Sequence, residues 1–152
     1  MTLQVPDEEW QFPATLNSLS SLGTALRRYL AGFSVDESWI YPLDLALCEA
    51  ASNIIRHGYP TRKEAGYRVL FSHNNDAVTV VLIDQGLPVP AALFSAIPSD
   101  DGGQETPPEL ESLSEGGRGI ALIFACVDNV SYRSDNGENQ MTLHKTLPPT
   151  AG

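Results

Sequence analysis

Two neighbouring stretches near the middle of the chain show the hydrophobic patterns of β-strands. From Tyr67 to Ser72, large apolar side chains recur at every second position, which is typical of a strand with one buried face. Residues 77–83 (AVTVVLI) are almost continuously apolar and β-branched, as in a central strand that is covered on both faces. Turn-forming residues at 74–76 (NND) separate the two stretches, so the pattern predicts a β-hairpin.

Strands are also predicted near both ends of the chain. Residues 8–14 (EEWQFPA) indicate a short first strand, and residues 129–133 and 140–147 indicate a final pair. The sequence Asp-Asn-Gly at 135–137 lies between this pair, and such residues are typical of tight hairpin turns.

Three segments have the spacing of helices. Residues 16–31 form an amphipathic pattern, and a second helix is predicted from about Pro42 to His57. Proline suits the first turn of a helix, and the glycine at Gly58 is typical of its end. A third helix is predicted over about residues 119–127.

The stretch between the central hairpin and the third helix has a different composition. Residues 86–117 are rich in proline, glycine and acidic residues and poor in large apolar ones. We interpret this stretch as a long loop with short helical pieces. Loops of this length in compact domains often act as lids or binding segments, and we expect a lid over about residues 88–116.

The order of these elements predicts a two-layer α/β (α+β) sandwich. Its sheet would be mixed but mostly antiparallel, with helices on one face. A doubly wound fold is excluded because the strands do not alternate regularly with helices. A chain of 152 residues is about the size of one ordinary domain, so we expect a single domain over residues 1–152.

Composition and charge narrow the classes of function. The chain is 42% hydrophobic and 18% charged, with a formal net charge of -10, so nucleic acid is not expected as the main ligand. The acidic surface serves solubility, or it selects a basic protein partner. Cys48 and Cys126 lie in apolar stretches without a metal-binding spacing, and we interpret both as reduced core residues. The N-terminus lacks a signal peptide and no apolar run has membrane-spanning length, so a cytoplasmic protein is expected.

The second predicted helix carries the first candidate site. Glu49, Asn53 and His57 share one side of it, opposite the apolar residues. A solvated helix face is the ordinary explanation, but the arc around Asn53 is short-chained and neutral rather than a mixture of Glu and Lys. A carboxylate one turn from a carboxamide offers a proton acceptor beside an oxygen ligand. That pair suits hydrated Mg²⁺ and a nucleophile that approaches a phosphate.

The second candidate site follows the central strand. Asp84 at the strand end could accept a hydrogen bond from an exocyclic amine such as that of adenine. Gly86, two residues later, would let the backbone approach a flat ring closely. The alternative is an ordinary turn at a strand end, where Asp and Gly are common.

The third candidate site precedes the last helix. Gly116, Gly117 and Gly119 surround Arg118, and backbone N–H groups at a helix start can bind phosphate. The run is neither a Walker A motif nor a Rossmann turn, and a flexible hinge is the alternative. The order and spacing of the three sites, with a lid between the last two, together predict one nucleotide pocket.

These segments resemble the GHKL ATPases, the superfamily of histidine kinases, type II topoisomerases and bacterial anti-sigma kinases. CEAASNIIRHGY resembles the N box of that superfamily, IDQGLP its first glycine box and EGGRGIALI its second. The Glu-Ala-x-x-Asn-x-x-x-His-Gly-Tyr pattern from Glu49 to Tyr59 is most similar to the anti-sigma-factor serine/threonine kinases. The fold implied is the Bergerat, or histidine-kinase-like, ATPase fold.

The resemblance implies a role for each candidate residue. Glu49 would be the general base and Asn53 the Mg²⁺ ligand, while Asp84 and Gly86 would bind the adenine. The residues that would close on the phosphates of ATP are Gly116, Gly117, Arg118 and Gly119.

The resemblance also implies an activity and partners. The chain would be an ATP- and Mg²⁺-dependent protein serine/threonine kinase that phosphorylates an anti-sigma-factor antagonist and sequesters a sigma factor, with a homodimer expected. Two alternatives stay open: a partner-switching module that binds nucleotide without catalysis, and the detached ATPase domain of a histidine kinase. One departure concerns Pro88, which stands where many members have a glycine and which removes a loop N–H donor.

Overall fold

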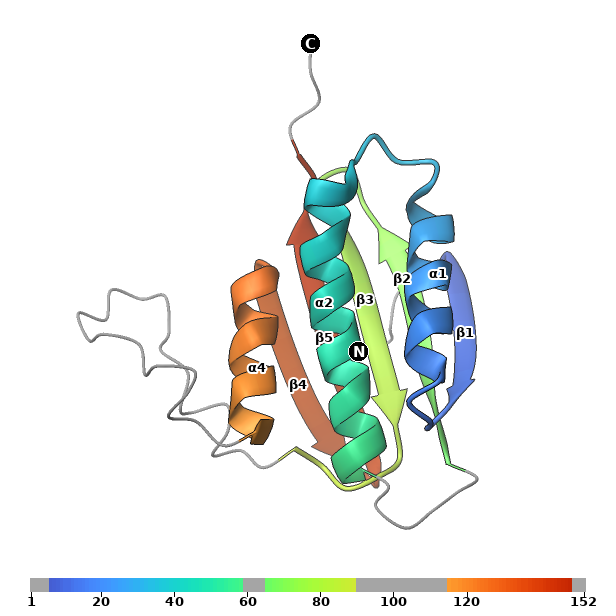
Figure 1. Cartoon of the computed structure of the whole chain (residues 1–152), viewed down its shortest axis with the longest axis vertical. Coiled ribbons are helices and arrows are strands. Elements are labelled where there is room, and N and C mark those ends of the chain that lie inside the picture. The colour runs from blue at the N-terminus through green and yellow to red at the C-terminus, as the bar shows by residue number, and fades with distance from the viewer. Residues whose placement is uncertain (1–5, 59–64, 90–114, 149–152) are drawn as a thin grey trace, which may run out of the picture.

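The structure is a computed structural model that describes residues 6–58, 65–89 and 115–148. Its elements, in chain order, are β1 (Glu8–Pro13), α1 (Ser18–Leu30), α2 (Glu37–Asn53), the π-helical turn η1 (Ile54–Gly58), β2 (Gly66–His73), β3 (Ala77–Asp84), α4 (Glu115–Cys126), β4 (Asn129–Asp135) and β5 (Glu138–Thr146). The three α-helices cover one face of the sheet (Figure 1). The predicted lid falls almost entirely on residues 90–114, outside the described residues.

The five strands form one sheet in the order β1-β2-β3-β5-β4. All four neighbouring pairs are antiparallel, which confirms the predicted two-layer sandwich with helices on one face. No parallel pair occurs among the described strands, although the prediction of a mixed sheet allowed for one. The long connection from β3 through α4 to β4 leaves room for β5 to return between them.

The core lies between the sheet and the helices. Leu82 of β3 and Phe71 of β2 pack there against buried residues of α1 and α2, and both are almost fully buried. Val81 and Ile83, the neighbours of Leu82 along β3, belong to a smaller buried cluster on the other face. Strand β3 is therefore buried on both faces, as its continuous apolar run predicts.

Helix α2 begins earlier than the sequence predicts. It starts at Glu37 rather than near Pro42, and Asp36 is its N-cap, whose side chain accepts a hydrogen bond from the Trp39 backbone N–H. Pro42 therefore lies inside the helix, where it removes one backbone donor. The α-helix ends at Asn53 and continues as a π-helical turn. The predicted end near His57 therefore falls in the π-helical turn and not in the α-helix.

The start of α4 also differs from the prediction. The helix begins at Glu115 rather than near Gly119, so the glycine-rich run lies in its first turns and not in a preceding loop. The apolar residues that follow, including Ile120 and Ile123, are fully buried. Packing of this apolar stretch evidently outweighs the low helix propensity of glycine.

The final hairpin has the predicted turn. Asn136 and Gly137 have φ angles of 53° and 79°, and positive φ at both central residues is the requirement of a type I′ turn. The strands extend to the turn on both sides, from Asp135 to Glu138.

Several chain segments that are distant in sequence meet at one end of the molecule. The end of α2, the end of β3, the start of α4 and the β4–β5 turn all lie at the lower end in Figure 1. Among the described residues, no helix is both long and apolar enough to cross a membrane.

Candidate functional site

Glu49 and Asn53 of α2 face the glycine-rich first turns of α4. An added Cβ on Gly119 would lie 3.1 Å from Glu49 Oε2 and 3.6 Å from both Asn53 Oδ1 and Asn53 Nδ2. A contact of 3.1 Å is closer than a side chain normally tolerates. The two helices can therefore approach this closely because position 119 has no side chain. Glu49 and Asn53 consequently do not lie on a solvated helix face.

The amide of Asn53 is incompletely bonded. Its Nδ2 atom is buried and has no hydrogen-bond partner among the residues that the structure describes. A buried donor without a partner is costly and uncommon in folded proteins. Such a donor suits a phosphate oxygen, and the Oδ1 atom of the same amide is a suitable ligand for Mg²⁺.

At the end of β3, the carboxylate of Asp84 is almost fully buried. Its Oδ1 atom accepts hydrogen bonds from the Gly86 backbone N–H and from Asn139 Nδ2, both at 2.9 Å. Burial raises the pKa of Asp84, and these two hydrogen bonds oppose the rise. In the described part of the chain, no donor bonds Oδ2, so this oxygen can still accept a hydrogen bond.

The remaining residues of the predicted phosphate site lie at the start of α4. The backbones of Gly116, Gly117 and Arg118 belong to its first turn, whereas the Arg118 side chain is outside the described part of the structure, as is that of His57. Gly119 is the member of the run that the structure brings against Glu49 and Asn53.

Asn139 is a site residue that the sequence analysis missed. It lies opposite Asp84 in the β3–β5 ladder and is 1% exposed. A signal for it exists in the sequence: Asn139 is in phase with Met141 and Leu143, which face the core, so a polar residue occupies a core-facing position. Recognising its partner required the register between β3 and β5.

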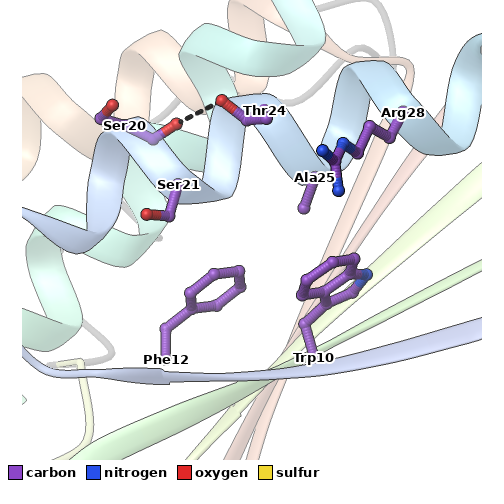
Figure 2. Close-up of a pocket in the computed structure, with 7 residues that line it drawn as sticks. All are labelled: Trp10, Phe12, Ser20, Ser21, Thr24, Ala25 and Arg28. Carbon is purple, nitrogen blue, oxygen red and sulfur yellow. Dashed lines mark hydrogen bonds between the residues drawn. The ribbon is translucent and has the colours of Figure 1, made fainter.

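A separate hollow of about 240 Å³ lies between β1 and α1. Figure 2 shows Trp10 and Phe12 of β1 on one side and residues of α1, including Thr24 and Arg28, on the other. None of the predicted site residues lines it. The hollow is therefore separate from the candidate site residues of α2, β3 and α4.

Residues 12–145 match the family of histidine kinase-like ATPase domains. The chain belongs to this family, which confirms the expected superfamily. Membership implies ATP as the ligand, in agreement with a site composed of a buried carboxylate, an unpartnered amide and a glycine-lined helix start.

The relatives of this chain include serine-protein kinases. The serine-protein kinase RsbW of Bacillus licheniformis is 31% identical over 108 residues, a match that covers 70% of this chain and 63% of that protein. The chain thus spans less than two thirds of this relative. The serine-protein kinase RsbW of Staphylococcus epidermidis is 28% identical over 132 residues, covering 85% of this chain and 80% of that protein.

A solved structure with the same fold contains the RsbU and RsbW domains of a Mycobacterium tuberculosis protein. The TM-score is 0.59 at 20% sequence identity, and the match covers 94% of this chain and 34% of that one. At this identity the similarity shows the fold alone.

Proposed function

We propose that this chain is an ATP- and Mg²⁺-dependent protein serine/threonine kinase that regulates a sigma factor in the cytoplasm. Its phosphoryl acceptor would be an anti-sigma-factor antagonist, and the sigma factor itself would be a second partner. The names of the RsbW relatives support the kinase activity. The observation that carries the proposal is the convergence of Glu49, Asn53 and Gly119 at the contact between α2 and α4.

The residues present fit Mg²⁺ and the phosphates of ATP. Asn53 would hold the metal ion through Oδ1, while its unpartnered Nδ2 would donate to a phosphate oxygen. The N–H groups of the first turn of α4 are the backbone donors that a helix start offers to an anion. When bound, Mg²⁺ neutralises charge that develops on the phosphates during transfer.

Glu49 has the chemistry and the position for the proton transfer. Its carboxylate lies one helical turn from Asn53 and against Gly119, so it is close to the proposed phosphate site. The serine or threonine hydroxyl of the partner would attack the terminal phosphorus, lose its proton to Glu49, and become the phosphoester as ADP leaves. Positioning and charge stabilisation are the main demands of this reaction, so few side chains are needed.

Asp84 would select the base. Its Oδ2 atom is the acceptor for the exocyclic amine of adenine, and Gly86 would lie along the ring. A base with a carbonyl oxygen at that position would bring two acceptors together, and a buried pair of acceptors is costly. The site would therefore prefer ATP to GTP.

Two variants of α2 separate binding from transfer. Calorimetry with MgATP should show saturable binding to the wild type and to Glu49→Gln, and none to Asn53→Ala. Phosphoryl transfer from radiolabelled ATP to proteins that co-purify with the chain should fall by about 10²-fold or more in Glu49→Gln, because a positioned base contributes that much. Glu138→Gln, an exposed change at the start of β5, is the control.

The outcomes distinguish the proposal from its alternative. If Glu49→Gln and wild type transfer phosphate at equal rates, Glu49 is not the base. If neither transfers phosphate although both bind MgATP, the chain is a partner-switching module rather than a kinase. Absence of MgATP binding to the wild type would overturn the proposal as a whole.

A further inference from the structure

Asn139 joins three strands at the end of the sheet that carries Asp84. In the strand ladders it lies opposite Asp84 of β3 and opposite Ser134 of β4. It faces the helices together with Met141 and Leu143, which alternate with the outward-facing residues of β5. A nearly fully buried carboxamide in this row must have its hydrogen-bonding groups satisfied by the protein.

All the polar atoms of the Asn139 side chain are used. Nδ2 donates to Asp84 Oδ1 at 2.9 Å and to the Gly86 carbonyl oxygen at 2.8 Å, and Oδ1 accepts from Ser134 Oγ at 2.7 Å. The orientation of the amide follows from these partners, since an ionised carboxylate and a carbonyl group can only accept. Asn139 is therefore held in one orientation by three residues.

This arrangement determines which oxygen of Asp84 is available. Oδ1 receives two protein donors, from Asn139 and from the Gly86 backbone. No donor among the described residues bonds Oδ2, so the two protein donors leave this oxygen as the free acceptor of the carboxylate. The Asn139 hydrogen bond also lowers the pKa of Asp84 against the effect of burial, which favours the ionised form.

The Asn139 side chain also holds the loop that follows β3. Gly86 is bound through its N–H to Asp84 and through its carbonyl to Asn139. Beyond Pro88, which has no N–H, the Val89 N–H donates to the Tyr132 hydroxyl at 2.8 Å. Side chains of β4 and β5 thus hold the loop on both sides of the proline, where a second glycine is absent.

We propose that Asn139 is a positioning residue of the nucleotide site, which acts through Asp84 and Gly86 and sets the preference for a base with an exocyclic amine. This inference rests on the proposed binding of ATP. It adds that the base preference depends on a side chain of β5 that does not itself contact the nucleotide.

The test compares two nucleotides that differ only in the amine. MgATP and the magnesium complex of purine riboside triphosphate, which lacks the 6-amino group, are titrated into the full chain. The wild type should bind MgATP at least tenfold more tightly, because a hydrogen bond to a charged group has about that effect. In Asn139→Ala, the affinity for MgATP should fall at least tenfold and the ratio of the two dissociation constants should approach one.

The ratio of the two dissociation constants distinguishes a positioning role of Asn139 from a merely structural one. If Asn139 only stabilises the fold, both nucleotides weaken by the same factor and the ratio stays at the wild-type value, which would overturn the inference. The control Gln140→Ala changes the next residue of β5, whose side chain points to the other face, and should leave the ratio unchanged. If the wild type binds neither nucleotide, the proposed function fails instead.

A second variant keeps the test decisive if Asn139→Ala does not fold. Ser134 is exposed, so Ser134→Ala should fold, and loss of its hydrogen bond to Asn139 should lower the ratio about two- to fivefold. If Ser134→Ala folds and its ratio of dissociation constants stays at the wild-type value, the inference is contradicted.

Discussion

Gly119 of α4 lies so close to Glu49 of α2 that a Cβ atom at position 119 would be 3.1 Å from the Glu49 carboxylate. Its backbone is not left-handed, since Gly137 is the glycine with a positive φ among the described residues. The requirement at position 119 is therefore one of space, and the space adjoins both proposed catalytic-site residues of α2. A substitution at position 119 should therefore impair the proposed site more than it affects the stability of the fold.

We expect Gly119→Ala to impair the site without unfolding the protein. Alanine in a helix is favoured over glycine by about 1 kcal/mol, while the end of the flexible Glu49 side chain must move by a few tenths of an ångström. The unfolding free energy should be equal to that of wild type or up to about 1 kcal/mol higher. MgATP binding or phosphoryl transfer should fall at least tenfold, as measured by calorimetry and by radiolabel transfer.

Gly32→Ala provides the matched control for this substitution. No atom lies within 4 Å of an added Cβ at Gly32, so binding and transfer should stay at wild-type values. Unchanged transfer in Gly119→Ala would show that the α2–α4 contact opens before catalysis and that the close approach has no functional role.

Asp84→Asn should abolish nucleotide binding and leave the fold at least as stable as wild type at pH 7. Burial raises the pKa of Asp84 in the folded state, so the ionised carboxylate is less favourable there than in the unfolded chain. This contribution to stability is present below the ordinary Asp pKa of about 4 and is lost as the pH rises through the folded-state pKa. Asparagine carries no charge, and its Oδ1 can still accept from Gly86 and Asn139.

Thermal unfolding between pH 4 and pH 8 measures this effect. The variant should be at least as stable as wild type at pH 7, with the difference shrinking toward pH 4. MgATP binding should be lost because an amide donor would face the exocyclic amine. A less stable variant that still binds MgATP would contradict both parts of the interpretation of Asp84.

The strands and their turn could be predicted because their signals are local. The alternation from Tyr67 onward and the apolar run of β3 each report burial of a strand face, and Asn136-Gly137 supplies the positive φ angles of the turn. The return of β5 between β3 and β4 has no local signal, since it depends on pairing between residues far apart in the chain.

The helix boundaries were less predictable for identifiable reasons. Pro42 was compatible with a first helical turn, but the cap formed by Asp36 and the packing of Ile40 start α2 earlier. The glycines of α4 suggested a loop, but burial of the apolar residues that follow them, such as Ile120 and Ile123, outweighs their low helix propensity. Asn139 required the strand register, because no property of residues 138–141 alone identifies Asp84 as its partner.

Asp7 connects the start of the sheet to α1 and predicts a pH dependence of stability. Its Oδ2 atom accepts from the Tyr29 hydroxyl and lies next to His73 Nδ1, both at 2.6 Å. The hydrogen bond from Tyr29, followed by that from His73, lowers the pKa of Asp7. A lowered pKa stabilises the fold above the ordinary Asp pKa, and this contribution is lost as the pH falls through the folded-state value.

Asp7→Asn should therefore lower the melting temperature at pH 7 but not at the acidic end of the range. Melting curves from pH 7 to pH 3 should converge for variant and wild type as Asp7 becomes protonated. Asp135→Asn, at an exposed site near the β4–β5 turn, is the control and should follow the wild type throughout. A constant difference between Asp7→Asn and wild type would mean that Asp7 acts through packing rather than charge.

Gly137→Ala should have the opposite outcome to Gly119→Ala, with a loss of stability and an intact site. Gly137 has a φ of 79°, and no atom lies within 4 Å of an added Cβ, so the cost arises from the backbone alone and should be about 1–2 kcal/mol. A slip of register could relieve that strain, but it would turn Met141 and Leu143 out of the core. The pairing of Asn139 with Asp84 and Ser134 should therefore persist.

Chemical denaturation should show the lower unfolding free energy, while the MgATP affinity of the folded variant should stay within about threefold of wild type. A larger loss of affinity would mean that the turn itself sets the geometry around Asn139.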